Sequence, residues 1–356
     1  MKYALIGCGR IATNHIKAAL ANGFEIIAVC DIVPEQMDRL LAKFSLENSG
    51  IRRYTDYKIM IEETSPELIS IATDSGVHAE IALFCLAQGI DTIIEKPIAM
   101  SIEDADRIVA LAEEKGLKVA VCHQNRFNNA VQAVRQALDE GRFGRLSHGS
   151  VNVRWNRNED YYRQAEWRGK WASDGGTLMN QCIHGIDLLR WLMGGNVVEV
   201  YGVTRRRFHD YLEAEDVGLA VITFADGSVA TIEGTVNVYP RNLEETLYIF
   251  GETGTAKLGG QATNNIEVWN FADELDGDVE KRTLKEVSAN VYGNGHISLF
   301  ADMADSIANN RSPYVSAKDG RDALEIVLAI YKSQKTGLPV TLPLTNFAST
   351  DMEGEF

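Results

Sequence analysis

Lys96 and its neighbours form the first sequence feature that could do chemistry. Glu95-Lys96-Pro97 directly follows the aliphatic run 92–94, which is typical of a buried strand. A lysine held at the end of such a strand can hydrogen-bond a reacting hydroxyl group and stabilise the alkoxide that develops on its oxygen. Glu95 could orient that lysine. A purely structural ion pair between Glu95 and Lys96 would give the same pattern, so these residues alone do not establish catalysis.

His184 is the second feature, because it occurs with other polar residues on one side of a predicted helix. A glycine pair at 175–176 opens this helix, and Asn180, His184 and Asp187 follow at the spacing i, i+4, i+7, which places them on one face. Buried polar groups are costly unless they line a cleft. An imidazole accepts a hydroxyl proton near neutral pH, and Asp187 could fix its tautomer. We therefore expect His184 and Lys96 to be catalytic. The alternative is that His184 is a structural histidine in the core.

A glycine turn, Gly7-Cys8-Gly9-Arg10-Ile11-Ala12, lies between an apolar strand and a helix near the N-terminus. Gly7 permits the tight turn, Gly9 lets a pyrophosphate approach the backbone, and the helix N-terminus offers N–H groups to phosphate. Asp31 ends the second strand 24 positions after Gly7, close to the ~20-residue spacing of the acid that binds an adenosine ribose. A carboxylate there would repel a 2′-phosphate, so these residues predict NAD rather than NADP. The alternatives are a glycine turn without a ligand and an aspartate that only serves the turn.

Strands and helices in alternation are expected to position these residues. Aliphatic runs at 3–6, 26–30, 68–71, 92–94 and 118–121 alternate with amphipathic segments, which indicates βαβ units and a parallel sheet. After Cys122, longer segments alternate apolar and polar residues around hairpin-type turns at 225–228 and 251–254. The predicted fold class is an α/β Rossmann domain plus an α+β C-terminal domain with a mostly antiparallel, open-faced sheet.

The change of pattern after Cys122 also predicts the domain boundaries. We expect an NAD-binding Rossmann domain at residues 1–122 and an α+β substrate-binding and oligomerisation domain at 123–347. The last residues, 348–356, are acidic and are expected to form a flexible tail.

Composition excludes several classes of function. The formal net charge is −15 and the hydrophobic content is 45%, which is typical of a globular protein that repels nucleic acid and anionic lipid. The five cysteines form no C-x-x-C pair, so neither a zinc site nor a disulfide framework is expected. No apolar run reaches the ~18 residues of a membrane span. We expect a cytoplasmic protein with no metal, no nucleic-acid partner and no membrane partner.

The glycine turn, Glu95-Lys96-Pro97 and the His184-x-x-Asp187 helix, in this order and spacing, resemble the Gfo/Idh/MocA oxidoreductase family over about residues 1 to 345. In that family the lysine and the histidine are the active-site pair, which the resemblance places at Lys96 and His184. Many members have an aspartate one turn before the histidine, where this chain has Asn180. An amide cannot exchange protons at physiological pH, so the resemblance leaves Asn180 as a substrate contact.

Further segments resemble a subgroup, the nucleotide-sugar 3-dehydrogenases, which oxidise the C3 hydroxyl of UDP-N-acetylglucosaminuronate or of UDP-N-acetylglucosamine. The keto sugar is then used to make 2,3-diamino sugars of surface polysaccharide. These segments are 124–126, 156–171, 179–181, 239–244, and 291–293 with His296. The implied substrate contacts are Asn180, Gln181, Asp187, Arg126, Tyr161, Arg163, Tyr239 and Arg241. The expected cofactor contacts are Gly7, Gly9, Arg10, Ile11, Asp31, Thr73, Ser75, His78, Glu95, Lys96, Gln124, Trp167 and Arg168. A surface arginine or a core tyrosine is the alternative for each Arg and Tyr.

Two other functions fit the sequence less completely. An inositol or a free sugar could be the alcohol, but the arginine set and segment 152–171 exceed what a small neutral alcohol needs. A non-catalytic NAD-binding sensor would not need Lys96 and His184 together. The resemblance further implies a homotetramer that forms through the open sheet face, and 2-oxoglutarate as the second substrate with which some relatives regenerate NAD.

Overall fold

The computed structural model describes residues 1–260, 263–285 and 295–356, which form two compact units. The first unit contains residues 1–99, 104–122 and 296–321, and the second contains 100–103, 123–295 and 322–356. The chain therefore returns to its first unit after most of the second has been formed. Segment 291–293, which contributed to the family resemblance, lies outside the described residues.

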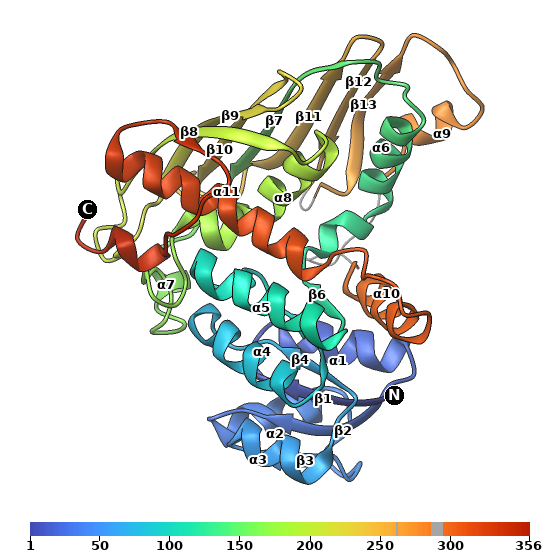
Figure 1. Ribbon diagram of the computed structural model, residues 1–356, viewed down its shortest axis with the longest axis vertical. Coiled ribbons are helices and arrows are strands. Elements are labelled where there is room, and N and C mark those ends of the chain that lie inside the picture. Colours follow the sequence, from blue (N-terminus) through green and yellow to red (C-terminus); the bar gives the residue numbers. More distant parts are fainter. Residues whose placement is uncertain (261–262, 286–294) are drawn as a thin grey trace. The chain divides into compact units, whose positions relative to one another are not determined.

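The first unit is built on a six-stranded sheet in the order β3-β2-β1-β4-β5-β6, and every neighbouring pair is parallel. This is the strand order of a dinucleotide-binding Rossmann domain. Its strands are β1 (Lys2–Ile6), β2 (Glu25–Cys30), β3 (Arg52–Tyr54), β4 (Leu68–Ile71), β5 (Asp91–Ile94) and β6 (Val119–Val121). The helices are α1 (Ala12–Ala21), α2 (Pro34–Lys43), α3 (Tyr57–Thr64), α4 (His78–Ala87), most of α5 (Ile102–Lys115) and nearly all of α10 (Gly295–Ala308), as Figure 1 shows.

Burial explains why the strands of the first unit are continuously apolar. All four residues of β4 and all three of β6 are buried, as expected for a parallel sheet covered on both faces. Helix α10 packs on this sheet through Phe300, whose ring lies 5.8 Å from that of Tyr3 and 5.5 Å from that of His15. The late segment is thus part of the core of the first unit.

The second unit contains an eight-stranded sheet in the order β13-β12-β11-β7-β10-β9-β8-β14, in which only the pair β10 and β7 is parallel. The strands are β7 (Leu146–Arg154), β8 (Val197–Arg205), β9 (Val217–Phe224), β10 (Val229–Thr235), β11 (Glu244–Gly251), β12 (Gly254–Gly259), β13 (Asn265–Phe271) and β14 (Val340–Thr341). The predicted fold class of both domains is confirmed.

Helices cover one face of this larger sheet, and the other face is open (Figure 1). The covering helices are α6 (Asn129–Asp139), α8 (Ile183–Leu192) and α11 (Ala317–Thr336), and shorter helices are α7 (Glu159–Tyr162) and α9 (Asp278–Arg282). Residues on β8, β9 and β10 alternate between buried and exposed, as expected for a sheet with one solvated face.

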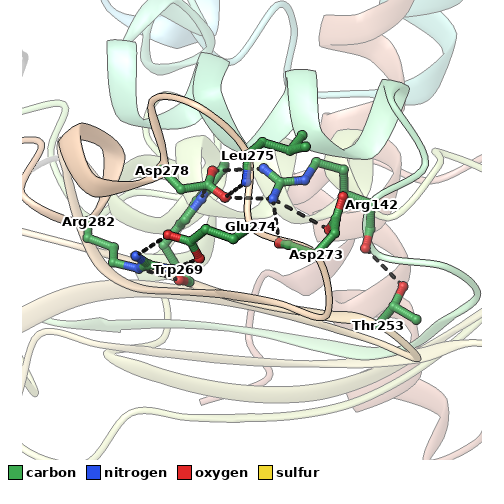
Figure 2. Close-up of polar contacts among 8 residues, drawn as sticks. All are labelled: Arg142, Thr253, Trp269, Asp273, Glu274, Leu275, Asp278 and Arg282. Carbon is green, nitrogen blue, oxygen red and sulfur yellow. Dashed lines mark hydrogen bonds and ion pairs between the residues drawn. The ribbon is translucent and has the colours of Figure 1, made fainter.

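A buried ion pair fastens the outer edge of this sheet to the turn that follows α6. Figure 2 shows Arg142 donating to both carboxylate oxygens of Asp278, at 2.9 and 2.8 Å. The Trp269 indole donates to the same carboxylate at 2.7 Å, and the guanidinium carbon of Arg142 lies 4.3 Å from the centre of the Phe271 ring. Because Asp278 begins α9 and Trp269 lies in β13, these contacts hold the edge strand and its following helix in place.

Two of the predicted boundaries need correction. Residues 296–321 belong to the first unit, whereas the sequence pattern assigned them to the second domain. The end of the chain is folded rather than loose, because Ser349–Met352 form a 3₁₀ helix, Ser349 donates to the carbonyl of Trp171 at 2.6 Å, and Phe356 stacks on the Trp171 ring. None of the helices in the described part of the chain combines the length and apolar character needed to cross a bilayer.

Candidate active-site residues

The glycine turn between β1 and α1 has the geometry that a dinucleotide requires. Gly7 has φ +91°, and a Cβ atom there would lie 2.5 Å from the carbonyl carbon of Ala72, so no other residue fits. A Cβ at Gly9 would meet no atom within 4 Å, which leaves its backbone approachable. Helix α1 then begins at Ala12 without a side-chain cap, at the kind of helix N-terminus that binds phosphate. The turn fits the diphosphate of NAD.

Asp31 is held rigidly where the predicted ribose contact should be. Its Oδ2 accepts a hydrogen bond from the backbone N–H of Cys8 at 2.7 Å, and its Oδ1 accepts one from the N–H of Val33 at 2.8 Å. The carboxylate is therefore joined to the glycine turn itself. A fixed anion beside this turn suits a ribose diol and opposes a 2′-phosphate.

His78, expected to contact the cofactor, has a structural place instead. The side chain is buried, its Nδ1 lies 2.8 Å from the carbonyl oxygen of Pro97, and its Nε2 lies 3.3 Å from that of Thr73. Burial lowers the pKa of His78. The neutral ring has one N–H, and the shorter distance assigns it to Nδ1, which donates to Pro97 in the loop that follows β5. Thr73 is half-buried and Ser75 buried in the loop that follows β4.

Glu95 and Lys96 follow β5 as predicted, but the glutamate is used differently from the expectation. Its buried carboxylate Oε1 lies 2.9 Å from Nε2 of His15 and 3.2 Å from Nε2 of His296. Burial alone would raise the pKa of Glu95, but these two hydrogen bonds outweigh it and hold the pKa well below its ordinary value. Oε2 accepts the backbone N–H of Lys96 at 3.3 Å. Glu95 therefore holds the backbone of Lys96, and Lys96 itself is half-buried.

The helix that carries His184 begins with an unexpected π-helical turn, Leu178–Cys182, before α8. Asn180 lies in this turn, so the predicted α-helical spacing to His184 and Asp187 is interrupted there. Sequence reasoning missed Glu215, whose Oε1 accepts the N–H of Leu178 at 2.8 Å and the hydroxyl of Tyr331 at 2.9 Å. Burial raises the pKa of Glu215 to about 8. Single π turns occur frequently at functional sites.

Asn180 and Gln181 belong to a connected polar array. The Asn180 amide donates to Asp174 and its Oδ1 accepts from the Gln181 amide at 2.6 Å. Gln181 also donates to the hydroxyl of Tyr161 at 3.0 Å, and Arg168 donates to that hydroxyl at 2.6 Å. The structure thus brings together four predicted residues. Asp174, one position before the predicted glycine pair, was not foreseen, although a carboxylate beside a glycine hinge is a usable signal.

Arg126 and Asp187, both predicted to contact the substrate, form an ion pair with each other. Their side chains are 1% and 0% exposed, and the guanidinium donates to both carboxylate oxygens of Asp187, at 2.8 and 2.6 Å. The guanidinium carbon also lies 4.9 Å from the centre of the Trp191 ring. The pair joins the segment after β6 to α8, and a substrate contact by either residue stays a prediction.

The other predicted residues lie in differing surroundings. The ring of His184 meets that of His123 edge-on, with centres 5.7 Å apart. Gln124 is buried in the adjoining 3₁₀ turn, and Trp167 is half-buried, with the Arg168 guanidinium 4.5 Å from its ring centre. Arg163, Tyr239 and Arg241 lie on the surface of the second unit, and Arg10 lies on that of the first. Arg163 forms an ion pair with Glu159, and Tyr239 is 91% exposed.

Both parts of the chain match known protein families. Residues 1–123 match the model described as "Oxidoreductase family, NAD-binding Rossmann fold", and residues 131–257 match the model of the "GFO/IDH/MocA C-terminal domain". These matches agree with the glycine turn of the first unit and with the mostly antiparallel sheet of the second.

Individual relatives extend this similarity over the whole chain. The WlbA dehydrogenase from Bordetella pertussis, crystallised with NADH and UDP-GlcNAcA, is 34% identical over 97% of this chain and 99% of its own, with a TM-score of 0.86. D-apiose dehydrogenase of Paraburkholderia graminis is 26% identical over 96% of this chain and 89% of its own length. Inositol 2-dehydrogenase of Salmonella typhimurium is 25% identical over 95% of each chain. The chain belongs to the Gfo/Idh/MocA family and is an NAD-dependent dehydrogenase that acts on a sugar or polyol.

Proposed function

We propose that the protein oxidises the C3 hydroxyl of UDP-N-acetylglucosaminuronate, or of its parent UDP-N-acetylglucosamine, to the 3-keto sugar, for the cytoplasmic synthesis of 2,3-diamino sugars. The observation that carries this substrate is the 34% identity, over nearly the whole chain, to a WlbA dehydrogenase crystallised with NADH and UDP-GlcNAcA. D-apiose and inositol dehydrogenases are similar at lower identity.

In the proposed reaction His184 and Lys96 share the work on one hydroxyl group. His184 takes the hydroxyl proton as general base, since an imidazole is a proton acceptor near neutral pH. The Lys96 ammonium donates a hydrogen bond to the same oxygen and stabilises the negative charge that develops on it. When bound, NAD supplies the hydride acceptor. Asn180 contacts the substrate without exchanging a proton.

The polar array of the second unit supplies the proposed sugar-nucleotide contacts. Arg168 lies with its guanidinium carbon 4.3 Å from the Tyr161 ring centre and donates to the Tyr161 hydroxyl, so its orientation is fixed. A fixed guanidinium recognises phosphate or carboxylate oxygens, and such local positive charge is needed in a chain of net charge −15. The exposed Arg163, Tyr239 and Arg241 remain candidate contacts for the nucleotide.

Mass spectrometry of products from a panel of UDP-sugars, inositols and free sugars, each with NAD and with or without 2-oxoglutarate, tests this function directly. We expect a product 2 Da lighter from UDP-N-acetylglucosaminuronate or UDP-N-acetylglucosamine. The 2-oxoglutarate arm shows whether bound NADH is reoxidised in place. Turnover of an inositol or a free sugar, with every UDP-sugar unchanged, would replace this substrate with the second candidate.

Thermal-shift measurements separate the two substrate classes without turnover. A specific ligand at 100 times its Kd adds about 2.7 kcal/mol of stability. UDP-sugars are expected to raise the melting temperature of the NADH-bound protein, and inositols are expected to leave it unchanged. The opposite order favours the polyol.

Substitutions test the catalytic pair. Lys96→Met and His184→Asn are each expected to reduce kcat by ~100-fold or more, because each removes a group that acts on the transition state. NADH binding, followed by fluorescence titration, should be retained in both variants. Full turnover in either variant excludes that residue as catalytic.

A further inference from the structure

Three buried histidines surround the turn that carries Lys96. They are His15 in α1, His78 at the start of α4 and His296 in α10, and their exposed fractions are 0%, 1% and 3%. All three belong to the first unit. The catalytic role proposed above uses none of them, yet each has a ring nitrogen at hydrogen-bond distance from a residue beside Lys96.

Two of these histidines fix the residue before Lys96. Nε2 of His15 and Nε2 of His296 both face Oε1 of Glu95, at 2.9 and 3.2 Å. Burial lowers the pKa of His15, although Glu95 opposes that effect. A neutral ring then carries its proton on Nε2 in order to donate to the carboxylate. The other oxygen, Oε2, accepts the N–H of Lys96.

The third histidine fixes the residue after Lys96. Nδ1 of His78 lies 2.8 Å from the carbonyl oxygen of Pro97, a normal length for a strong hydrogen bond. Burial favours the neutral form of this ring, so the donor is the Nδ1–H tautomer. Imidazoles from different helices therefore contact the Glu95 carboxylate before Lys96 and the Pro97 carbonyl after it.

A metal ion is the competing explanation for part of this cluster. Donor atoms of His15, Glu95, Cys122 and His296 all lie within 4.8 Å of one another and all four residues are buried. A histidine that binds a metal through Nε2 carries a proton on Nδ1 and nearly always donates it to an acceptor. Among the residues that the structure describes, Nδ1 of His15 and Nδ1 of His296 have no hydrogen-bond partner. This arrangement fits two neutral histidines that donate from Nε2–H to Glu95, because Nδ1 then carries only a lone pair and needs no acceptor. It therefore favours hydrogen bonds over a metal ion.

On the basis of the function proposed above, we infer that His15, His78 and His296 are positioning residues that hold the Glu95-Lys96-Pro97 turn so that the Lys96 ammonium meets the reacting hydroxyl. A catalytic group must be held close to its productive position by the residues around it, and a misplacement of 1 Å can cost about 100-fold in rate. Lys96 has a long, flexible side chain, and a fixed backbone limits the positions that its ammonium group can reach.

His296 uses Nε2 and His78 uses Nδ1, so one pair of substitutions, Gln and Asn, should have opposite effects at the two positions. A glutamine amide reaches the position of a histidine Nε2, and an asparagine amide reaches that of Nδ1. His296→Gln should keep the donor to Glu95, whereas His296→Asn should lose it. At position 78 the order is reversed: His78→Asn should keep the donor to Pro97, and His78→Gln should lose it.

Two measurements on the NAD-bound protein read out this pattern. Amide hydrogen exchange of the peptide that spans 94–99 should be ~10-fold faster in His296→Asn and His78→Gln, while the matched variants stay within about threefold of the wild type. With a substrate that the wild type turns over, kcat should fall ~10-fold or more in the same two variants, with KM for NAD within about twofold. Thermal unfolding and NADH binding confirm that each variant is folded.

Several outcomes would overturn the inference. Equal exchange rates in the Gln and Asn variants at both positions would show that these hydrogen bonds do not hold the turn. Crossed exchange rates with an unchanged kcat would show that the turn is held but that Lys96 does not depend on it. One equivalent of metal in purified wild-type protein, absent from His296→Asn, would make the cluster a metal centre. Wild-type turnover in Lys96→Met refutes the proposed function itself, whereas loss in that variant without the crossed pattern refutes this inference alone.

Discussion

Glu245 is a buried carboxyl group in β11 whose ionisation is governed by its surroundings. Its side chain is 2% exposed, and burial raises its pKa from 4.5 to about 8. The cause of this shift is burial, which disfavours the charged carboxylate. At neutral pH the folded protein therefore keeps this group protonated, whereas the unfolded chain ionises it.

This shift predicts a pH dependence of stability. Between pH ~4.5 and ~8 the folded state binds a proton that the unfolded state has released, so stability falls as pH rises, by about 1.4 kcal/mol per pH unit for one group. Its contribution is complete below pH 4.5 and is lost as pH rises through about 8. Glu245→Gln stays neutral, so we expect it to be more stable than the wild type at pH 9 and similar at pH 4.5. Urea unfolding at both pH values measures the difference; an equal gap at both would contradict the assignment.

Asp31 gives a second prediction at this scale. Asp31→Asn removes the negative charge beside the predicted ribose contact, although its single amide oxygen can accept from only one of the N–H groups of Cys8 and Val33. We expect the ratio of NADPH to NADH affinity to rise by about tenfold or more, because the repulsion of a 2′-phosphate is gone. Fluorescence titration with both reduced cofactors measures this ratio. An unchanged ratio would place the adenosine ribose away from Asp31.

What a sequence shows about single residues is their type and spacing, but not their burial. The glycine turn and Asp31 could be predicted because backbone conformation and strand position restrict them directly. The family resemblance predicts a substrate contact for Arg126, and the shared helix face predicts one for Asp187, but neither signal shows that the two side chains form a buried ion pair with each other. Glu215 gave no signal, since it lies in the acidic segment 213–216 just before β9, and such a segment is ordinarily on the surface.

At the scale of elements, the Arg126–Asp187 pair joins the 3₁₀ turn Gln124–Phe127 to α8. Removing one member of a buried ion pair leaves an uncompensated charge and typically costs about 3–5 kcal/mol. Asp187→Leu is expected to destabilise the protein by this amount, as chemical denaturation would show. The double variant Arg126→Met/Asp187→Leu should recover part of the loss. A double variant less stable than the single one would indicate that the pair is not isolated.

The order of elements could be predicted better than their local geometry. Aliphatic runs and hairpin turns predicted β1, β2, β4, β5 and β6 and the strands from β7 to β12. The short strands β3 and β14 give too few residues for a pattern. The π turn could not be predicted, because it depends on Glu215 accepting the Leu178 N–H and on Gly176, where a Cβ atom would lie 1.5 Å from the Glu215 carboxylate.

At the scale of the molecule, the open face of the larger sheet exposes large apolar side chains on three neighbouring strands. Tyr201, Leu219, Val221 and Val229 are 41 to 53% exposed, and Tyr201 pairs with Val221 across β8 and β9. Exposed apolar surface of this kind favours association, and we propose a homotetramer. Leu219→Lys/Val221→Lys should shift sedimentation toward smaller species. Leu338→Lys, at an exposed position outside this sheet, is the control, and equal sedimentation of the two variants would exclude this face.

The domain boundary shows the limit of prediction from a linear pattern. A change in the pattern of apolar and polar residues after Cys122 predicted the point where the chain leaves the first unit, because the composition of the strands changes there. The return at residues 296–321 has no such mark, since α10 has the amphipathic pattern of any covering helix. Only contacts such as those of Phe300 with Tyr3 and His15 reveal which core it completes.

Because residues 296–321 belong to the first unit, that unit can finish folding only late in translation. Glu95 is translated 201 residues before His296. Most of the second unit is therefore synthesised before the first unit receives His296 and the helix that packs on β1. Premature termination anywhere in that interval yields a fragment whose dinucleotide turn is complete in sequence but whose core is unfinished.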